Sequence, residues 1–289
     1  MPDNAAKPKR LPPWFNVSFK GKKERGEVRR ILRELNLHSV CESAHCPNIC
    51  DCWRKKTATF MIMGPHCTRN CRFCAVTHQP PSPLDPGEPA RVAEAADRLG
   101  LKHVVVTSVT RDDLADGGAD HFVRTIQAIK LRLPAVSIEV LVPDFRGDLD
   151  QVSRVADTAP TVFNHNIETC RRLTSRLRDH ASYDRSLKIL THAARNWPDP
   201  LIVKSGFMLG VGETDDEIRD TLMDLKHAGV TSVTIGQYLA PSEAHWPVDR
   251  FVSPEAFAAW KTFCVEGLGF AHVACGPQVR SSYHADDHI

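Results

Sequence analysis

The stretch Thr59-Phe-Met-Ile-Met63-Gly-Pro-His-Cys67-Thr-Arg-Asn-Cys71-Arg-Phe-Cys74 joins a short apolar run directly to three closely spaced cysteines. The run from Thr59 to Met63 predicts a buried strand. Three thiolates within eight residues can converge on one side of a loop and bind three irons of a cubane cluster. The fourth iron would then have no protein ligand, which makes it a place for chemistry. Zinc is the alternative, because His66 or His78 could complete a set of four ligands.

Strand and helix signals alternate from this run toward the C-terminus. The expected strands are 59–63, 103–108, 136–142, 161–166, 201–208 and 232–236. The expected helices lie near 88–99, 117–132, 147–157, 184–195, 214–228 and 253–267. The helix 214–228 has the clearest signals, with the capping box Thr214 and Glu217 at its start and Gly229 at its end.

This alternation predicts crossover units around a parallel sheet, which makes the chain an α/β protein. Six units fit a partial (β/α)6-type barrel better than a closed eightfold one. We expect three parts: a basic arm and cysteine-rich extension over 1–56, the barrel over 57–270, and a C-terminal tail over 271–289. Chemistry should lie at the carboxyl ends of the strands.

Composition indicates a globular protein, with 42% hydrophobic and 25% charged residues in 289. No apolar run is long enough for a membrane span and no export signal is visible, so we expect a cytoplasmic protein. Seven of the ten cysteines fall within 41–74, and crowded thiols without an export signal favour metal binding over disulfides.

Basic residues are concentrated at the start of the chain. Residues 1–37 carry ten Lys or Arg against four acids, while the net charge of the whole chain is +2. This segment is either a solvated tail or a docking arm for an acidic partner. Nucleic acid is a poor candidate, because the basic excess does not continue into the rest of the chain.

A second cysteine group precedes the first: Cys41-Glu-Ser-Ala-His-Cys46-Pro-Asn-Ile-Cys50-Asp-Cys52-Trp53. Its composition fits a loop that is held by its ligands. Taken alone, it could form a zinc knuckle or bind a second iron–sulfur cluster.

Together these motifs resemble a known family. Cys67-x3-Cys71-x2-Cys74 resembles the loop of the radical S-adenosylmethionine (SAM) superfamily, and the segment from Cys41 to Trp53 is similar to the lipoyl synthase family within it. The resemblance extends from about Leu11 to Asp286. Further matching segments are 106–114, 139–144, 163–168, 204–210, 236–239 and 276–286.

The resemblance implies a sulfurtransferase that inserts two sulfur atoms, at C6 and C8 of a protein-bound octanoyl-lysine. It implies two 4Fe–4S clusters and SAM as cofactors. One cluster, at Cys67, Cys71 and Cys74, would cleave SAM to a 5′-deoxyadenosyl radical. The other, auxiliary cluster would supply the sulfur.

The same resemblance assigns the ligands of the auxiliary cluster, and strand-end position indicates the SAM contacts. The auxiliary cluster would be held by Cys41, Cys46, Cys52 and Ser282. Serine oxygen is a poor match for iron in a sulfide cluster, so that iron could leave and expose sulfide. Strand-end residues are the expected SAM contacts, and they are Ser108, Asn164, Asn166, Glu168 and Lys204. For each of them an ordinary strand-end hydrogen bond is the alternative, and Arg280 would position substrate or screen the auxiliary cluster.

The expected partners are an octanoylated lipoyl carrier domain or an H protein of the glycine cleavage system, an electron donor such as flavodoxin or ferredoxin, and a cluster-repair carrier. No nucleic acid or membrane partner is expected. Two alternatives remain: another radical SAM enzyme, such as a methylthiotransferase or a biotin-synthase-like sulfur inserter, or a non-enzymatic iron–sulfur or zinc module.

Two cysteines depart from the family pattern. Cys50 stands where a small residue such as glycine is usual, and Cys275 replaces a frequent serine. We expect Cys50 to be a buried thiol, and we expect Cys170 and Cys264 to be small buried residues on helices.

Overall fold

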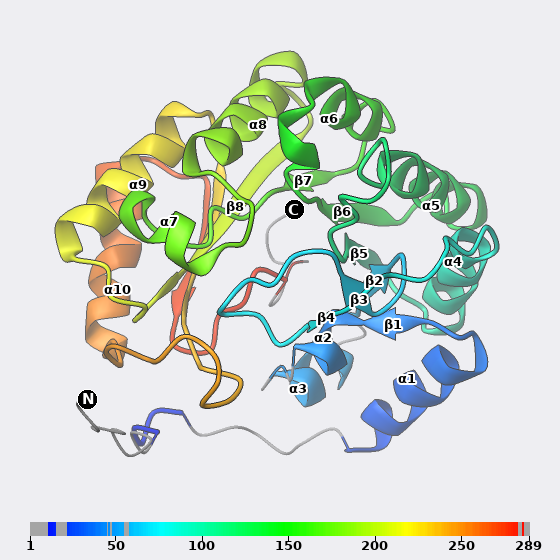
Figure 1. The fold of residues 1–289 in the computed structure, drawn as a ribbon, viewed down its shortest axis with the longest axis horizontal. Coiled ribbons are helices and arrows are strands. Elements are labelled where there is room, and N and C mark those ends of the chain that lie inside the picture. Colours follow the sequence, from blue (N-terminus) through cyan, green and yellow to red (C-terminus); the bar gives the residue numbers. More distant parts are fainter. Residues whose placement is uncertain are drawn as a thin grey trace.

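A computed structural model describes residues 11–15, 22–44, 46, 48–54, 58–282 and 285. Its centre is an eight-stranded sheet with the order β1-β2-β5-β6-β7-β8-β9-β10 (Figure 1). The strands are β1 (His38–Ser39), β2 (Thr59–Ile62), β5 (His103–Ser108), β6 (Ser137–Leu141), β7 (Val162–Asn164), β8 (Ile202–Leu209), β9 (Ser232–Gln237) and β10 (His272–Gly276). From β2 to β10 all neighbours are parallel, and β1 pairs antiparallel with β2. A separate pair joins β3 (His66–Cys67) to β4 (Thr77–His78).

Helices form an arc outside this curved sheet (Figure 1). They are α1 (Lys22–Glu34), α2 (Val40–Ser43), α3 (Ile49–Arg54), α4 (Glu88–Arg98), α5 (Ala119–Arg132), α6 (Leu149–Ala156), α7 (Arg171–Leu177), α8 (Tyr183–Asn196), α9 (Asp215–His227) and α10 (Pro254–Thr262). Among the described strands no ladder joins β10 back to β1. The fold is therefore the expected partial α/β barrel.

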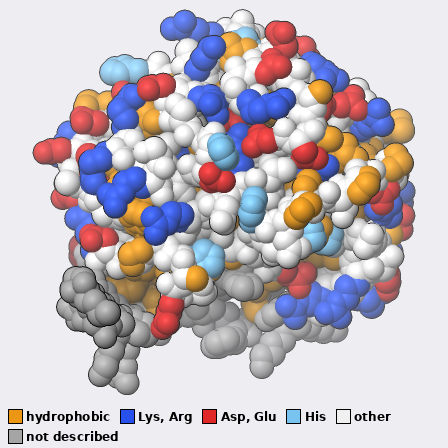
Figure 2. Space-filling view, viewed as in Figure 1, with side chains coloured by type: hydrophobic (Ala, Val, Ile, Leu, Met, Phe, Trp, Pro, Cys, Tyr) orange, Lys and Arg blue, Asp and Glu red, His pale blue; other side chains and the backbone are white. Residues whose placement is uncertain are grey.

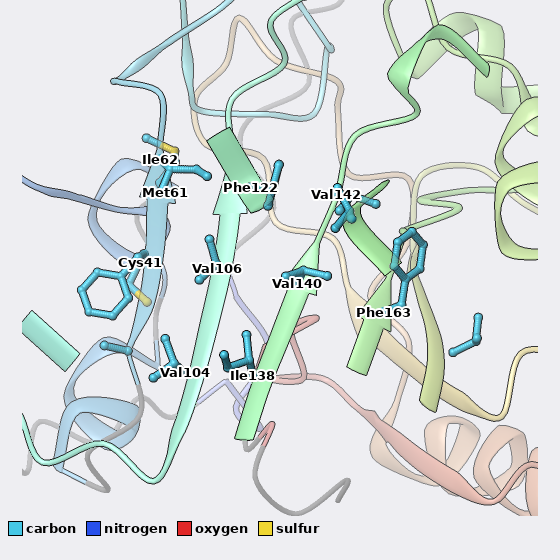
Figure 3. Close-up of a cluster of buried hydrophobic side chains, with 14 of the residues drawn as sticks. Cys41, Met61, Ile62, Val104, Val106, Phe122, Ile138, Val140, Val142 and Phe163 are labelled. Carbon is cyan, nitrogen blue, oxygen red and sulfur yellow. The ribbon is translucent and has the colours of Figure 1, made fainter. Parts of the chain in front are cut away.

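Buried apolar side chains cover both faces of the sheet. This is typical of a parallel sheet, whose strands lie between the barrel interior and the outer helices. Val104, Val105 and Val106 are consecutive in β5, and all three are fully buried. Figure 3 shows apolar side chains along β2, β5, β6 and β7, with Cys41 beside β2. The unbroken apolar runs of the sequence therefore mark strands that are covered on both sides.

Six strands and six helices lie where the sequence predicts them. The capping box at the start of α9 is present, because the Thr214 hydroxyl accepts from Glu217 N and the Glu217 carboxylate accepts from Thr214 N. Cys170 and Cys264 are buried as expected, Cys170 directly before α7 and Cys264 in the short helical segment Phe263–Gly267 after α10.

Three elements differ from the prediction. The stretch 41–53 is not a plain loop, because α2 and α3 carry three of its cysteines, Cys41, Cys50 and Cys52. Helix α7 has only seven residues, three of them arginines, and too few apolar positions to reveal a period. Strand β10 lies in the expected C-terminal segment and adds a seventh parallel strand. Its five residues, His272–Gly276, form too short a run to be predicted as a strand from the sequence.

None of the described helices is long and apolar enough to cross a bilayer. Much of the expected basic arm lies outside the described residues, including Lys7, Lys9, Arg10 and Lys20. Within this basic segment the structure forms α1 over Lys22–Glu34.

Candidate active site

A cavity of about 570 Å³ opens at the carboxyl ends of the parallel strands. Both groups of cysteines line it, since Cys41, Cys46 and Cys52 face it together with Cys67, Cys71 and Cys74. The C-terminal residues Ser281 and Ser282 also contribute to its wall. Segments from the two ends of the chain and from the first βα loop therefore meet in one space.

The loop with Cys67, Cys71 and Cys74 follows β2 and is shaped by main-chain hydrogen bonds to sulfur. Cys67 Sγ accepts from the main-chain N–H of Arg69 at 3.4 Å and of Thr110 at 3.3 Å. Cys71 Sγ accepts from Asp179 N at 3.4 Å. Such donors stabilise negative charge on sulfur, which is the form that binds metal.

The thiols of this loop are close enough to influence one another. Burial, with the neighbouring Cys71 and Cys67 adding to it, raises the pKa of Cys74 to about 12. Burial also raises the pKa of Cys71. Without metal the thiols of Cys71 and Cys74 hold their protons, so a metal group that binds them must displace those protons.

Arg69, inside the same loop, is buried and connects it to two other loops. Its Nε and Nη2 donate to the carboxylate of Asp112 at 2.7 and 2.9 Å, and Nη2 also donates to Asp144 at 2.6 Å. Arg185 donates to the other oxygen of Asp144 at 2.9 Å. Burial opposes the charge on Asp144, but Arg69 and Arg185 together with other nearby positive groups outweigh it and hold the pKa of Asp144 well below its usual range. The network fixes the position of the cysteine loop.

The upstream cysteines are placed by short helices. The Ser39 hydroxyl caps α2 by accepting from Cys41 N at 3.1 Å, and Cys46 N donates to Cys41 O at 3.0 Å. Asn48 O accepts from Cys52 N at 3.0 Å at the start of α3. Burial raises the pKa of Cys46 to about 11, and the Cys41 thiol nearby adds to that rise. Cys50 is buried and is not part of the cavity wall, as expected of a structural thiol.

The C-terminal segment reaches the cavity by packing directly on β9. A Cβ at Gly236 would lie 2.1 Å from Val279 O, so only glycine permits this approach. Asn48 Nδ2 donates to Gln278 O at 2.5 Å, which ties the segment to the upstream cysteines. Arg280 lines the cavity, and burial lowers the pKa of its guanidinium.

Two of the buried polar atoms without a hydrogen-bond partner among the described residues belong to cavity residues. They are Ser108 Oγ at the end of β5 and Asn166 Oδ1 after β7. The Asn166 amide donates to Glu168 at 3.1 Å, and burial raises the pKa of Glu168. A polar ligand in this cavity would supply the missing partners.

Comparison with known proteins agrees with this geometry. Residues 61–248 match the radical SAM superfamily. The chain is 52% identical over 278 residues to lipoyl synthase of Caldanaerobacter subterraneus subsp. tengcongensis, covering 96% of each chain. It is 50% identical to lipoyl synthase of Symbiobacterium thermophilum, covering 96% of this chain and 86% of that one. The chain belongs to the lipoyl synthase family.

The solved structure of methylornithine synthase has a similar fold, with a TM-score of 0.57, 14% identity, and coverage of 89% of this chain and 83% of that one. The radical SAM lipoyl synthase family uses SAM and 4Fe–4S clusters, and the residues here suit them. Two sets of three thiols line one cavity, and the ten cysteines, all within the described residues, form no disulfide.

The donor arrangement is less suited to a single zinc ion. Zinc gathers its ligands within about 2.3 Å of one point. Among the described residues no three Cys, His, Asp or Glu side chains are gathered for one ion. A cubane spreads its thiolates over separate irons, so it accepts a wider spacing.

The structure brings together most of the residues expected in the site. Ser108, Asn166, Glu168 and Ser282 line the cavity with the six cysteines. Asn164 and Lys204 are not brought to it. Lys204 is fully buried and donates to both oxygens of Glu139 at 3.1 and 3.0 Å, and Asn164 donates to Glu139 at 2.9 Å. Their strands end in the site, but these side chains lie in the barrel interior beside a carboxylate from β6.

Sequence reasoning missed Arg69, Asn48 and Gly236 as positioning residues. Arg69 and Asn48 stand inside the two cysteine motifs, and Asp112 and Asp144 stand in segments that match the family. The available signal for Arg69 was its position as a charged residue between Cys67 and Cys71. The close approach at Gly236 had no local signal, because it depends on a segment 43 residues away.

Proposed function

We propose that this chain inserts two sulfur atoms into an octanoyl chain carried on a lysine of a protein, as a lipoyl synthase. One observation carries the proposal. Two sets of three cysteines and a serine line a single cavity of about 570 Å³ in a chain that belongs to this family. A shared cavity allows a radical made at one set to reach a substrate next to the other.

In this proposal Cys67, Cys71 and Cys74 hold one 4Fe–4S cluster, and Cys41, Cys46, Cys52 and Ser282 hold the auxiliary one. When bound, the first supplies the electron that cleaves SAM to a carbon radical, and the auxiliary one supplies sulfur. The N–H groups of Arg69, Thr110 and Asp179 would stabilise the thiolates. Arg69 would fix the loop with Cys67, Cys71 and Cys74. Gly236 and Asn48 would fix the C-terminal segment so that Ser282 faces the cavity.

We propose that Ser108, Asn166 and Glu168 bind SAM. Among the described residues Ser108 Oγ and Asn166 Oδ1 have no hydrogen-bond partner, and a buried carboxylate would bind an ammonium group. Glu168 has a left-handed backbone, with φ 67°, that β8 holds through Gly206 O and Met208 N. A Cβ at Gly206 would lie 2.4 Å from Thr234 and 3.1 Å from Asn166, so glycine leaves room for this arrangement.

The substrate implied by the family is an octanoylated carrier protein. We propose a lipoyl carrier domain or H protein as that carrier, flavodoxin or ferredoxin as electron donor, and a cluster-repair carrier. Ten cysteines without a disulfide support a reducing compartment, the cytoplasm. We further propose the division into 1–56, 57–270 and 271–289.

Metal and sulfide analysis tests the proposal against its alternatives. Anaerobically purified and reconstituted protein should hold about two cubanes per chain, or about eight irons and eight sulfides. A single cubane would leave no source of sulfur. Zinc bound in place of iron would support the alternative of a non-enzymatic zinc module.

A serine variant tests the auxiliary site. Ser282→Cys gives the leaving iron a stronger ligand, so it should retain SAM cleavage and lose sulfur insertion. Ser281→Cys is the matched control, because Ser281 also lines the cavity. Unchanged lipoyl product from Ser282→Cys would show that a labile serine ligand is not needed.

A further inference from the structure

Two arginines on the molecular surface share one aromatic ring beside the loop with Cys67, Cys71 and Cys74. The guanidinium carbon of Arg72 lies 4.6 Å from the ring centroid of Trp246, and that of Arg176 lies 5.1 Å from it. Both arginines are exposed, while Trp246 is almost completely buried. We call Arg72 and Arg176 the guanidinium pair, and Trp246 is the ring on which both stack.

The pair carries uncompensated charge. Within the described part of the chain, neither Arg72 nor Arg176 forms an ion pair with a carboxylate. Two other arginines of the same helix do, Arg171 with Asp184 and Arg172 with Glu217 at 2.7 Å. Holding two cations on one ring is unfavourable by Coulomb repulsion, so an anionic partner that binds there gains from both charges.

The pair is also held rigidly. Arg72 N donates to Leu177 O at the end of α7, and Trp246 N donates to Arg72 O, both at 2.8 Å. The Trp246 indole N–H donates to Val211 O at 2.9 Å. A surface whose backbone and aromatic ring are already fixed loses little entropy when a partner docks.

The position of the pair connects it to the cluster loop. Arg72 lies between Cys71 and Cys74 in the sequence and is exposed to solvent, whereas both cysteines line the cavity, so this surface adjoins the loop on its solvent side. Figure 2 shows Lys and Arg side chains gathered over the region that α7 occupies in Figure 1. A partner docked here lies within a few residues of the ligands to which an electron must come.

We propose that the guanidinium pair is the docking surface for an acidic one-electron carrier protein. The carrier gives up one electron and is oxidised, and the cluster held by Cys67, Cys71 and Cys74 is reduced by that electron. This inference rests on the proposed function for the fate of the electron. The surface itself follows from the charge and position of Arg72 and Arg176.

Binding to the reconstituted protein in the absence of SAM tests the surface without enzymatic turnover. The probe is a fluorescently labelled acidic flavodoxin, and the reading is Kd by anisotropy. Arg176→Gln should raise Kd about two- to fivefold at about 0.1 M NaCl, the range of one exposed ion pair. The difference should vanish at about 1 M NaCl, where the Debye length falls to about 3 Å.

Arg219→Gln is the matched control. Arg219 is also exposed, forms no ion pair among the described residues, and stacks on Phe263 at 4.9 Å, but it is on α9. It should leave Kd for flavodoxin unchanged. Equal Kd values for Arg176→Gln and Arg219→Gln would overturn the proposal.

Turnover separates the electron carrier from the octanoylated carrier. With limiting flavodoxin, Arg176→Gln should lose the same factor in rate, while turnover with dithionite as reductant should not change. If affinity for an octanoylated carrier domain falls and that for flavodoxin does not, the surface belongs to the substrate protein and the proposal is wrong. If wild-type protein makes no lipoyl product with dithionite, the proposed function fails, and the Kd values still decide on the surface.

Discussion

Asn48 and Gln278, which are 230 residues apart, are joined by a hydrogen bond of 2.5 Å from the Asn48 side-chain amide to the Gln278 carbonyl. Asn48 is buried, and its own carbonyl accepts from Cys52 N. One residue therefore connects the upstream cysteines to the segment that carries Ser282. Asn48 acts through these neighbours, so we regard it as a positioning residue.

Asn48→Asp should uncouple sulfur insertion from SAM cleavage. A carboxylate cannot donate to Gln278 O, and it leaves two oxygens facing each other at the cost of a buried hydrogen bond, about 1–3 kcal/mol. We expect 5′-deoxyadenosine formation to persist and lipoyl product to fall at least tenfold. Both products can be followed by chromatography in one reaction. Asn196→Asp, which alters a similar amide bond to His192 O on α8, should leave both unchanged.

Arg69→Lys should loosen the cluster loop. Lysine is a point charge and cannot bridge Asp112 and Asp144 with the forked geometry of arginine. We expect a broadened or shifted electron paramagnetic resonance signal of the reduced cluster, along with lower iron occupancy. Arg69→Ala should cost about 1.5–3 kcal/mol in unfolding free energy, because the buried Asp144 keeps Arg185 but loses its charge-assisted hydrogen bond from Arg69.

Arg91→Lys serves as the control for that pair of variants. Arg91 pairs with the half-exposed Asp85 at 2.7 Å, and such surface pairs are worth about 0–1 kcal/mol. A resonance signal for Arg69→Lys that matches wild type would contradict the role of Arg69 in holding the loop.

Glu139 and Lys204 should make stability depend on acid pH. Burial opposes the charge of Glu139, but Lys204, His103 and Asn164 together outweigh it and lower the pKa of Glu139 to about 2. In the unfolded chain a glutamate has a pKa of about 4.3. Stability from this group is therefore complete above about pH 4.3 and is lost as the pH falls toward 2.

Urea unfolding at several pH values measures this effect. The double variant Glu139→Gln/Lys204→Met should show a flatter stability curve between about pH 4.3 and 2 than wild type. Lys204→Met alone should lose about 3–5 kcal/mol at neutral pH, because Glu139 stays buried without its cation. If the single and double variants are equally stable at neutral pH, the buried pair is not the source.

Glu168→Gln should stabilise the protein without ligand and weaken SAM binding. Burial raises the pKa of Glu168, so the folded state is penalised as the pH rises through that pKa and the side chain ionises. Glutamine removes this penalty, and Tm should therefore rise more at alkaline than at acid pH. Binding of SAM, measured by calorimetry, should weaken about tenfold or more. Higher Tm with unchanged affinity would remove Glu168 from the SAM site.

Much of the fold could be predicted from the sequence, because strands buried on both faces have unbroken apolar runs such as Val104–Val106. Helix α7 does not, since arginines fill most of its surface and only packing against the barrel identifies it. Among site residues, spacing indicated the two cysteine groups, and family resemblance indicated Ser282. Neither spacing nor family resemblance showed that Glu168 lines the cavity whereas Lys204 does not. Each lies on or after a strand of the barrel, and only the distant carboxylate of Glu139 decides that Lys204 lies in the interior.

The most direct test of the account is mass spectrometry of a peptide with an octanoyl-lysine, incubated with the reconstituted protein, SAM and a reductant. We predict that the peptide gains two sulfur atoms as a dithiol, which loses two hydrogens only on later oxidation to the dithiolane, and that a singly sulfurated species appears first. SAM cleavage with no sulfur gained by the peptide, from protein that holds both clusters, would contradict it.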